Sequence, residues 1–156
     1  QNSATVMSRI IQQQHESLEI LSLSRNELTG DFLETVCGAL SQCGRMKQLC
    51  LDDDCLSPGA LPVLASLLPS LPKLSVLRVA RNDFRAADDE ANLFAAAAES
   101  CSSLKELVMP ERALVSPRLL EALSAMARED LKVQHNQFRW YDEVENDEEG
   151  DEYDDH

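Results

Sequence analysis

The sequence predicts an α/β fold in which about five strand-helix repeats stack side by side around a parallel sheet. The first observation is the segment LEILSLSRNEL at residues 18–28, where apolar and polar residues alternate before an asparagine. The second is that this pattern recurs at steps of 28 to 30 residues. The third is that segments with the apolar spacing of helices separate the copies.

Four copies of the pattern are complete. If the first apolar residue is offset 0, each has apolar residues at offsets 0, 3, 5 and 10, and the copies cover residues 18–28, 46–56, 74–84 and 104–114. A fifth copy is degenerate, because Arg128 replaces the first leucine, although Leu131, Val133, Asn136 and Phe138 fit. Such regularity predicts one structural unit per copy.

Within each copy, the alternation around offsets 3 and 5 has the period of a strand with one buried face. At offset 8 the chain must turn inward, which leaves backbone groups without strand partners. An asparagine amide both donates and accepts hydrogen bonds, so Asn26, Asn82 and Asn136 are predicted to be buried structural residues. Asp54 at this offset can only accept, and Arg112 departs from the pattern.

Helices are expected between the strands, over residues 31–43, 57–70, 87–101 and 116–129. Ser57-Pro58 and Ser116-Pro117 both fit an N-cap followed by proline at the first helical position. One residue of each helix recurs at a similar distance after offset 8 and should face the strands; these are Leu40, Leu68, Ala98 and Met126.

A further helix is expected at residues 4–14, before the first strand. An end repeat without a cap exposes its apolar layer. We therefore expect further repeats or a partner chain to cover Val6, Ile10 and Ile11.

The repeat resembles the leucine-rich repeat, and its 28-residue period is similar to that of the ribonuclease-inhibitor-type subclass. The resemblance covers residues 4 to about 139. It implies a leucine-rich-repeat solenoid, a right-handed α/β horseshoe segment with the parallel sheet on its concave face. Residues 1–141 are interpreted as this domain, and residues 142–156 as an acidic tail that is expected to be disordered.

The charge of the chain restricts its partners. The net charge is -14, and ten acidic residues with no Lys or Arg lie in the tail. This excludes nucleic acid and anionic membrane surfaces as direct partners, because neither attracts an acidic protein. A basic protein could bind the tail.

Cysteine usage and hydropathy indicate an intracellular protein, cytoplasmic or nuclear. The five cysteines are odd in number and include no CxxC pair. No apolar run reaches the roughly 20 residues that span a bilayer, and no signal-peptide pattern is present.

No catalytic residue, metal site or cofactor is predicted. The histidines form no nucleophile motif with a cysteine, and no glycine-rich phosphate loop is present. Asp52, Asp53 and Asp54 are adjacent in a strand-like segment, so their side chains should diverge rather than bind one cation.

A protein partner is expected on the concave face, where the residues at offsets 2, 4, 6 and 7 form columns with a spacing of about 4.8 Å. An apolar patch with one arginine is predicted around the third and fourth repeats. The predicted partner-binding residues are Cys50, Val76, Arg78, Ala80, Arg81, Val108, Pro110 and Lys132.

Two alternatives to a partner site remain open at this face. The patch could be a surface that binds nothing. The offset-7 residues alternate in charge and could form a ladder of cross-strand ion pairs; they are Arg25, Asp53, Arg81, Glu111 and His135.

The leading hypothesis is a non-catalytic protein-interaction module. The resemblance implies two alternatives, a Ran-type GTPase-activating protein, whose repeats also precede an acidic tail, and the five-repeat actin-capping domain of tropomodulins, which is similar in size and period. The acidic tail does not resemble the tropomodulin C-terminus. Receptor-type repeats of innate immune sensors and ribonuclease inhibitor itself stay open.

Overall fold

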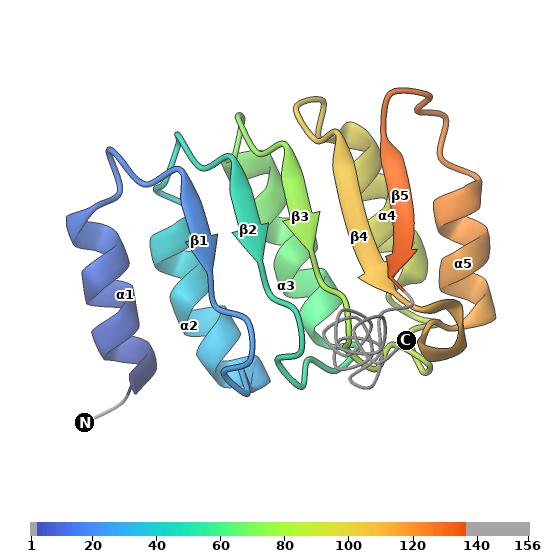
Figure 1. The fold of residues 1–156 in the computed structure, drawn as a ribbon, viewed down its shortest axis with the longest axis horizontal. Helices are drawn as coiled ribbons and strands as arrows, with labels where there is room; N and C mark the ends of the chain where they lie inside the picture. The colour runs from blue at the N-terminus through green and yellow to red at the C-terminus, as the bar shows by residue number, and fades with distance from the viewer. Residues whose placement is uncertain (1–2, 137–156) are drawn as a thin grey trace, which may run out of the picture.

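Strands and helices alternate along the chain in the computed structural model, which describes residues 3–136 (Figure 1). Within this range the strands are β1 (Ile20–Ser22), β2 (Gln48–Cys50), β3 (Val76–Arg78), β4 (Glu106–Pro110) and β5 (Lys132–Asn136). They form one sheet in the order β1-β2-β3-β4-β5, and every pairing is parallel. The predicted parallel sheet is confirmed.

In Figure 1, α2, α3 and α4 lie behind the sheet, α1 and α5 lie at its two ends, and each helix is beside the next. They are α1 (Ser3–Gln13), α2 (Gly30–Leu40), α3 (Ala60–Leu67), α4 (Ala91–Ser100) and α5 (Pro117–Ser124), with short 3-10 segments at Leu68–Ser70 and Arg112–Leu114. One sheet face is therefore covered by helices, and the opposite face carries no helix of the described chain.

The two predicted serine caps have different outcomes. Ser116 caps α5 as expected, because its Oγ accepts the Leu119 N–H at 3.1 Å and Pro117 is the first helical residue. The Ser57 cap is wrong. α3 begins at Ala60, after Gly59 at the N-cap position, and the Ala60 N–H donates to the Ser57 carbonyl, which places Ser57 in a preceding turn.

The core lies between the sheet and the helices and is built from stacked equivalent residues. At offset 3 the register places Leu21, Leu49, Leu77, Leu107 and Val133 side by side. The three central leucines are fully buried, whereas Leu21 at the edge is only partly buried. Leu40, Leu68 and Ala98 close the layer from the helices, as predicted, and Met126 is half-buried.

The turns after the strands require left-handed backbone. The offset-7 residues Arg25, Asp53 and Arg81 have φ values of 66°, 55° and 60°, a conformation that is unfavourable for residues other than glycine. These residues therefore belong to turns rather than strands.

Asn82 holds such a turn in place. Its Nδ2 donates to the carbonyls of Val79 and Ala80 in its own repeat and of Leu51 in the preceding one, at 3.0 to 3.1 Å. Its Oδ1 accepts the N–H groups of Asp54 and Leu56, also in the preceding repeat, at 3.1 and 3.0 Å. Asn82 is 2% exposed. The predicted role of this asparagine is confirmed.

Asp54 occupies the same position one repeat earlier and is fully buried. Its Oδ1 accepts the Asn26 N–H at 2.6 Å, but its Oδ2 has no hydrogen-bond partner among the described residues. Burial raises the pKa of the Asp54 carboxyl to about 6. The turn thus tolerates an acceptor in place of an amide, at the cost of one unsatisfied oxygen.

The fifth repeat is two residues out of the predicted register. Lys132 pairs with Glu106, His135 with Met109, and Asn136 with Pro110. Asn136 therefore lies in β5 rather than in a turn, and His135 is not in the offset-7 column. Both expectations are wrong, because they assumed that Arg128 takes the place of the missing first leucine.

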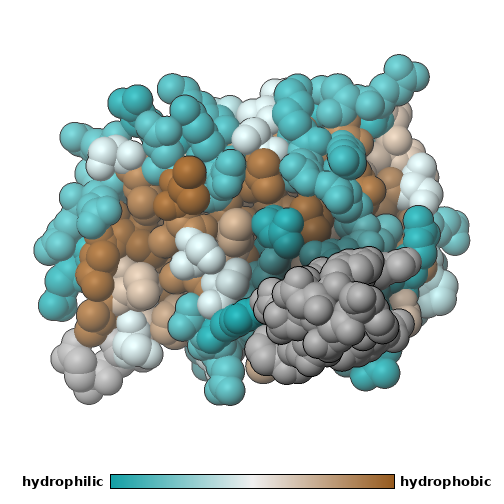
Figure 2. Space-filling view, viewed as in Figure 1, coloured by the Kyte–Doolittle hydropathy of each residue, from teal (hydrophilic) through white to brown (hydrophobic). Residues whose placement is uncertain are grey.

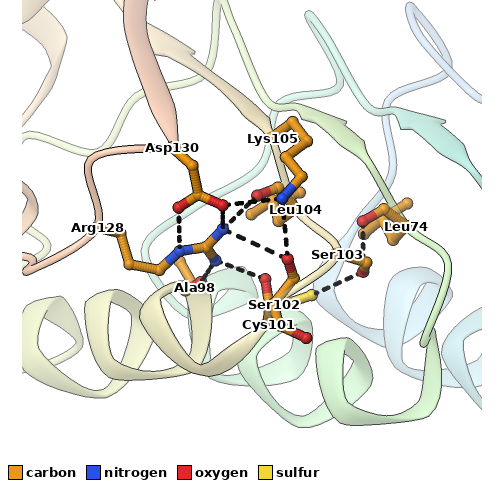
Figure 3. A network of polar contacts seen from close by, with 9 residues as sticks. All are labelled: Leu74, Ala98, Cys101, Ser102, Ser103, Leu104, Lys105, Arg128 and Asp130. Carbon is orange, nitrogen blue, oxygen red and sulfur yellow. Dashed lines mark hydrogen bonds and ion pairs between the residues drawn. The ribbon is translucent and has the colours of Figure 1, made fainter.

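Arg128 instead closes the end of α4 (Figure 3). Its Nη1 donates to the carbonyls of Cys101 at 2.6 Å and Ala98 at 3.4 Å, and its Nη2 to that of Leu104 at 2.8 Å. Carbonyls at a helix C-terminus have no partners within the helix, and a cation there interacts favourably with the helix dipole. The guanidinium is thus used as a cap, not as a core residue.

Asp130 holds the Arg128 guanidinium in this orientation. Its two carboxylate oxygens accept from Arg128 Nε at 3.1 Å and Nη2 at 3.0 Å, and Lys105 Nζ is 2.8 Å from Oδ2. These bonds keep the pKa of Asp130 well below its usual range. The Arg128 side chain is 11% exposed. The predicted boundary at residue 141 and the acidic segment 142–156 lie outside the described residues.

Candidate partner-binding face

The sheet face is defined as the side of the sheet that points away from the helices. Two columns of side chains cross it, one running through Ile20, Gln48, Val76, Glu106 and Lys132, the other through Ser22, Cys50, Arg78, Val108 and Gln134. In-register parallel pairing produces these columns, because strand side chains alternate between the faces.

Five of the eight predicted partner-binding residues are accessible. Cys50, Val76, Arg78 and Arg81 are partly buried, and Lys132 is exposed. Cys50, Val76 and Arg78 lie on neighbouring strands β2 and β3, whereas Arg81 is in the turn after β3.

Ala80, Val108 and Pro110 are not accessible, so their expected exposure is wrong. Ala80 is fully buried, Val108 is 2% exposed, and Pro110 is also buried. Val108 lies between Arg78 and Gln134, and Pro110 is paired with Asn136 because β4 and β5 extend further than the other strands. Alternation indicated the face of these residues but not their coverage by neighbours.

Lys132 is exposed but lies in the first column, opposite Glu106, and not beside Val108 as expected. The two-residue shift of β5 causes this change. Next to it, Gln134 Nε2 donates to the Glu106 carboxylate. The β4–β5 part of the sheet face is therefore polar.

Arg78 is fixed by Asp52, a residue that was missed as part of the site. Its Nε and Nη2 both lie 2.9 Å from Asp52 Oδ2, and Asp52 Oδ1 accepts the Ala80 N–H at 2.8 Å. The Arg78 side chain is 33% exposed. The opposite charges at offsets 6 and 4 of adjacent repeats could have revealed this pair, since both offsets face the same side.

Ile20 is the second missed residue. It is 61% exposed at the start of the first column. In Figure 2, hydrophobic surface gathers over the β1–β3 part of the sheet face and toward α1, and hydrophilic residues border it where the strands begin. The sheet face is thus divided into an apolar part over β1–β3 and a polar part over β4–β5.

Cys50 offers contact area rather than chemistry. Burial raises the pKa of its thiol, and the Asp52 carboxylate raises it further, while Arg78 opposes this. A neutral thiol is a weak nucleophile and a small apolar group. Burial also raises the pKa of Cys37 to about 12. Within residues 3–136, no cluster of three His, Cys, Asp or Glu side chains could hold a metal ion.

Charged pairs line the beginnings of the strands. Glu19 and Lys47 are 3.1 Å apart, and Lys105 and Asp130 are 2.8 Å apart. These side chains are about half exposed, so solvent screens the attraction within each pair. These pairs determine which charges lie at the beginnings of the strands, and they contribute little to the stability of the fold.

Comparison with known proteins identifies the fold. No protein-family model matches the sequence, and a search of curated proteins gives no match. Among solved structures, the tropomodulin C-terminal domain of Caenorhabditis elegans matches with a TM-score of 0.64 and 13% identity, over 96% of this chain and 99% of that one. The actin-binding site 2 of leiomodin-1 matches with a TM-score of 0.73 and 10% identity, over 100% and 99%.

These matches establish a shared fold, an α/β arrangement of the leucine-rich-repeat type with a five-strand parallel sheet in residues 3–136. They do not assign the repeat to the ribonuclease-inhibitor-type subclass. None of the helices within residues 3–136 has the length and apolar character required to cross a membrane.

Proposed function

We propose that the chain is a non-catalytic protein-interaction module of the actin cytoskeleton, which binds actin through the β1–β3 part of the sheet face. The observation that carries this proposal is the similarity in fold, over the whole chain, to the actin-binding site 2 of leiomodin-1. The match to a tropomodulin domain of nearly equal extent supports it. The actin-capping alternative is thus preferred to the Ran-type GTPase-activating protein.

The sheet face supplies what an interface requires. Val76 and Cys50 offer apolar area beside Arg78, whose guanidinium is already held by Asp52. A side chain that is ordered before binding loses less entropy on association, and arginine is frequent among the residues that dominate interface energies. The polar residues of β4 and β5 would form the rim of the contact.

We also infer that residues 1–141 form a right-handed solenoid segment, supported by the 28-residue period and the in-register strands. Residues 142–156 would form a separate acidic segment that binds a basic protein through charge, in a contact that salt weakens. The proposal implies a location inside the cell, in the cytoplasm or nucleus.

The proposal is tested with the 156-residue chain and purified actin. Binding to monomeric actin is measured by fluorescence anisotropy, and binding to filaments by co-sedimentation. Val76→Asp should weaken binding at least about tenfold, since it places a carboxylate in the apolar part of the interface. The matched control is Leu93→Asp on α4, a 55% exposed side chain on the helical side, which should not change binding.

Two results would contradict the proposal. If the unmodified chain binds neither form of actin, actin is not the partner. If Leu93→Asp weakens binding as much as Val76→Asp, the contact is on the helices and not on the sheet face.

A further inference from the structure

Two arginine–aspartate pairs of the chain have similar contacts but different surroundings. In the first pair, Arg128 Nε and Nη2 lie 3.1 and 3.0 Å from the two carboxylate oxygens of Asp130. In the second pair, Arg78 Nε and Nη2 both lie 2.9 Å from Asp52 Oδ2. In each pair the carboxylate holds the guanidinium edge formed by Nε and Nη2, and Nη1 is left for other acceptors.

The Nη1 group of Arg128 binds the end of a helix. It donates to the carbonyls of Cys101 at 2.6 Å and Ala98 at 3.4 Å, at the C-terminal end of α4 (Figure 3). The last carbonyls of a helix have no partner within the helix, and the helix dipole makes this end negative. The Arg128–Asp130 pair is therefore a receptor for a helix C-terminus, and the helix belongs to the same chain.

The Nη1 group of Arg78 has no hydrogen-bond partner among residues 3–136. The Arg78 side chain is 33% exposed, whereas that of Arg128 is 11% exposed. Arg78 lies on the sheet face between Cys50 and Val108, and no helix of the described chain covers this face. The Arg78–Asp52 pair thus has the donors of a helix receptor, but the described chain does not supply the acceptors.

The charge of the Arg78–Asp52 pair decides which acceptor it fits. Asp52 compensates the charge of the guanidinium, and the whole chain has a net charge of -14. A carboxylate of a partner would bring a second negative charge beside Asp52, and like charges that meet in an interface cost free energy. A backbone carbonyl has no net charge, and its hydrogen bond to arginine is strong because the donor is ionised. A carbonyl is therefore the better acceptor.

The surface around Arg78 fits the last turn of a helix. Val76 precedes Arg78 on the same face of β3, and Cys50 is paired with Arg78 in β2; both are partly buried and offer apolar area. The last turn of an amphipathic helix presents free carbonyls together with an apolar side chain. Both components therefore have a counterpart on the β1–β3 part of the sheet face.

We propose that Arg78, held by Asp52, binds the backbone carbonyls at the C-terminal end of a helix in the actin partner. This inference rests on the proposed function and adds the chemical group that the sheet face recognises. Arg78 Nη1 donates to carbonyls of the last turn, as Arg128 Nη1 does at α4, while Val76 and Cys50 contact an apolar side chain of that turn. Asp52 is a positioning residue, because it orients the guanidinium before the partner binds.

The first test measures binding of the 156-residue chain to monomeric actin by fluorescence anisotropy. Arg78→Lys keeps a cation beside Asp52 but removes the planar group that binds a carboxylate and carbonyls together, so the affinity should fall at least about tenfold. The matched control is Arg118→Met, an exposed arginine on α5, which should leave the affinity unchanged. Urea denaturation verifies that both variants are folded.

A second probe does not depend on actin. It is a stapled helical peptide of residues 91–104 with an amidated C-terminus, whose carbonyls include those that Arg128 binds in the folded chain. Titrated into the ¹⁵N-labelled 156-residue chain, it should cause a saturable NMR shift of the Arg78 Nε–H signal. The same peptide with a free C-terminal carboxylate should bind no more tightly, because its charge is repelled by Asp52.

The positioning role of Asp52 has its own readout. Asp52→Asn keeps an acceptor for the Ala80 N–H but no longer holds Arg78 by charge. Exchange of the Arg78 Nε–H with solvent should become faster, and the amidated peptide should bind more weakly. Unchanged exchange and unchanged peptide binding would show that Asp52 does not position Arg78.

The proposed function and this inference can fail separately. If the unmodified chain binds actin and Arg78→Lys binds it equally well, the proposed function stands and the inference is wrong. Tighter binding of the free-acid peptide than of the amidated peptide would also overturn the inference, because the acceptor would then be a carboxylate. If the chain does not bind actin, the proposed function fails and the amidated peptide decides: a saturable shift at Arg78 supports a receptor for helix ends, and no shift overturns it.

Discussion

Asn82 in the third repeat and Asn26 in the first hold the same position, yet their surroundings differ. Asn82 bonds to its own turn and to the turn before it, and it is 2% exposed. Among the described residues, the Asn26 side chain bonds only within its own turn, and Asn26 is exposed. The difference teaches that this asparagine stabilises a pair of repeats rather than a single turn.

Near the other end of the described chain, charged side chains bond across a repeat boundary. Arg128 caps α4, and Asp130 and Lys105 hold its guanidinium. The β1 end thus exposes apolar side chains and an amide oxygen, whereas polar contacts complete the repeat boundary between α4 and β5.

The largest expected effect concerns the two asparagines. Asn82→Ala should lower the free energy of unfolding by about 4 kcal/mol, because buried N–H and carbonyl groups of two turns lose their partner. Asn26→Ala should cost only about 1 kcal/mol. Urea denaturation of both variants measures the difference, and equal losses would contradict the comparison.

Arg128→Met should lower the free energy of unfolding by about 3 kcal/mol. Methionine keeps the length of the side chain but donates no hydrogen bond, so the carbonyls at the end of α4 lose a charged donor. Arg45→Met is the matched control, since Arg45 is 60% exposed and lies 3.8 Å from Glu19; it should change stability by less than about 0.5 kcal/mol. Similar losses for the two variants would show that Arg128 is not a cap.

Asp54→Asn should raise the free energy of unfolding by about 2 kcal/mol at neutral pH. The pKa of Asp54 rises from 3.8 to about 6 in the folded state, so the folded chain binds this proton more tightly than the unfolded chain. The resulting stability is fully present below about pH 3.8 and is lost as the pH rises through about 6. Asparagine also replaces the unpartnered Oδ2 by an NH2 group, which can donate to backbone carbonyls as Asn82 Nδ2 does.

The pH dependence provides the control for this variant. Unfolding in urea at about pH 4.5 and about pH 7.5 should show that Asp54→Asn raises the free energy of unfolding much more at the higher pH. In the folded wild-type chain, the Asp54 carboxyl is mostly charged only at that pH. A gain that is the same at both values would mean that the charge of Asp54 does not matter. Asn82→Asp places a carboxyl at the equivalent position of the third turn. It should lower the free energy of unfolding, and the loss should be larger at about pH 7.5 than at about pH 4.5.

The smallest expected effect is at Ile20 in β1. Ile20→Lys should change the free energy of unfolding by no more than about 0.5 kcal/mol, because the side chain is already 61% exposed. Leu49→Ala in the adjacent strand should cost about 3 kcal/mol, since Leu49 is fully buried. Thermal denaturation compares the two. A large loss for Ile20→Lys would contradict the exposure of this side chain.

The first four repeats could be predicted from the sequence because one residue pattern fixes both strand direction and register. The pairing of Ile20 with Gln48, then Val76, then Glu106 follows directly from the spacing of the leucines. The fifth repeat could not be predicted, because Arg128 stands at the expected spacing of the first leucine but is not a core residue. Its long cationic side chain finds carbonyls at a helix end, and the strand starts two residues later.

The candidate site was only partly predictable. Alternation shows which way Val108 and Ala80 point, but burial depends on the length of β4 and β5 and on the Asp52 carboxylate, which are tertiary features. The Asp52–Arg78 pair was readable from opposite charges on one face of adjacent repeats. The exposure of Ile20 depends on its place at the edge of the sheet, which the residue pattern does not encode.

The most direct test of the proposed function is amide hydrogen exchange of the 156-residue chain with and without monomeric actin. Slower exchange is expected in β2, β3 and their turns, around Cys50, Val76 and Arg78, with α2 to α5 unchanged. Slower exchange confined to the helices, or no difference in any segment, would contradict it.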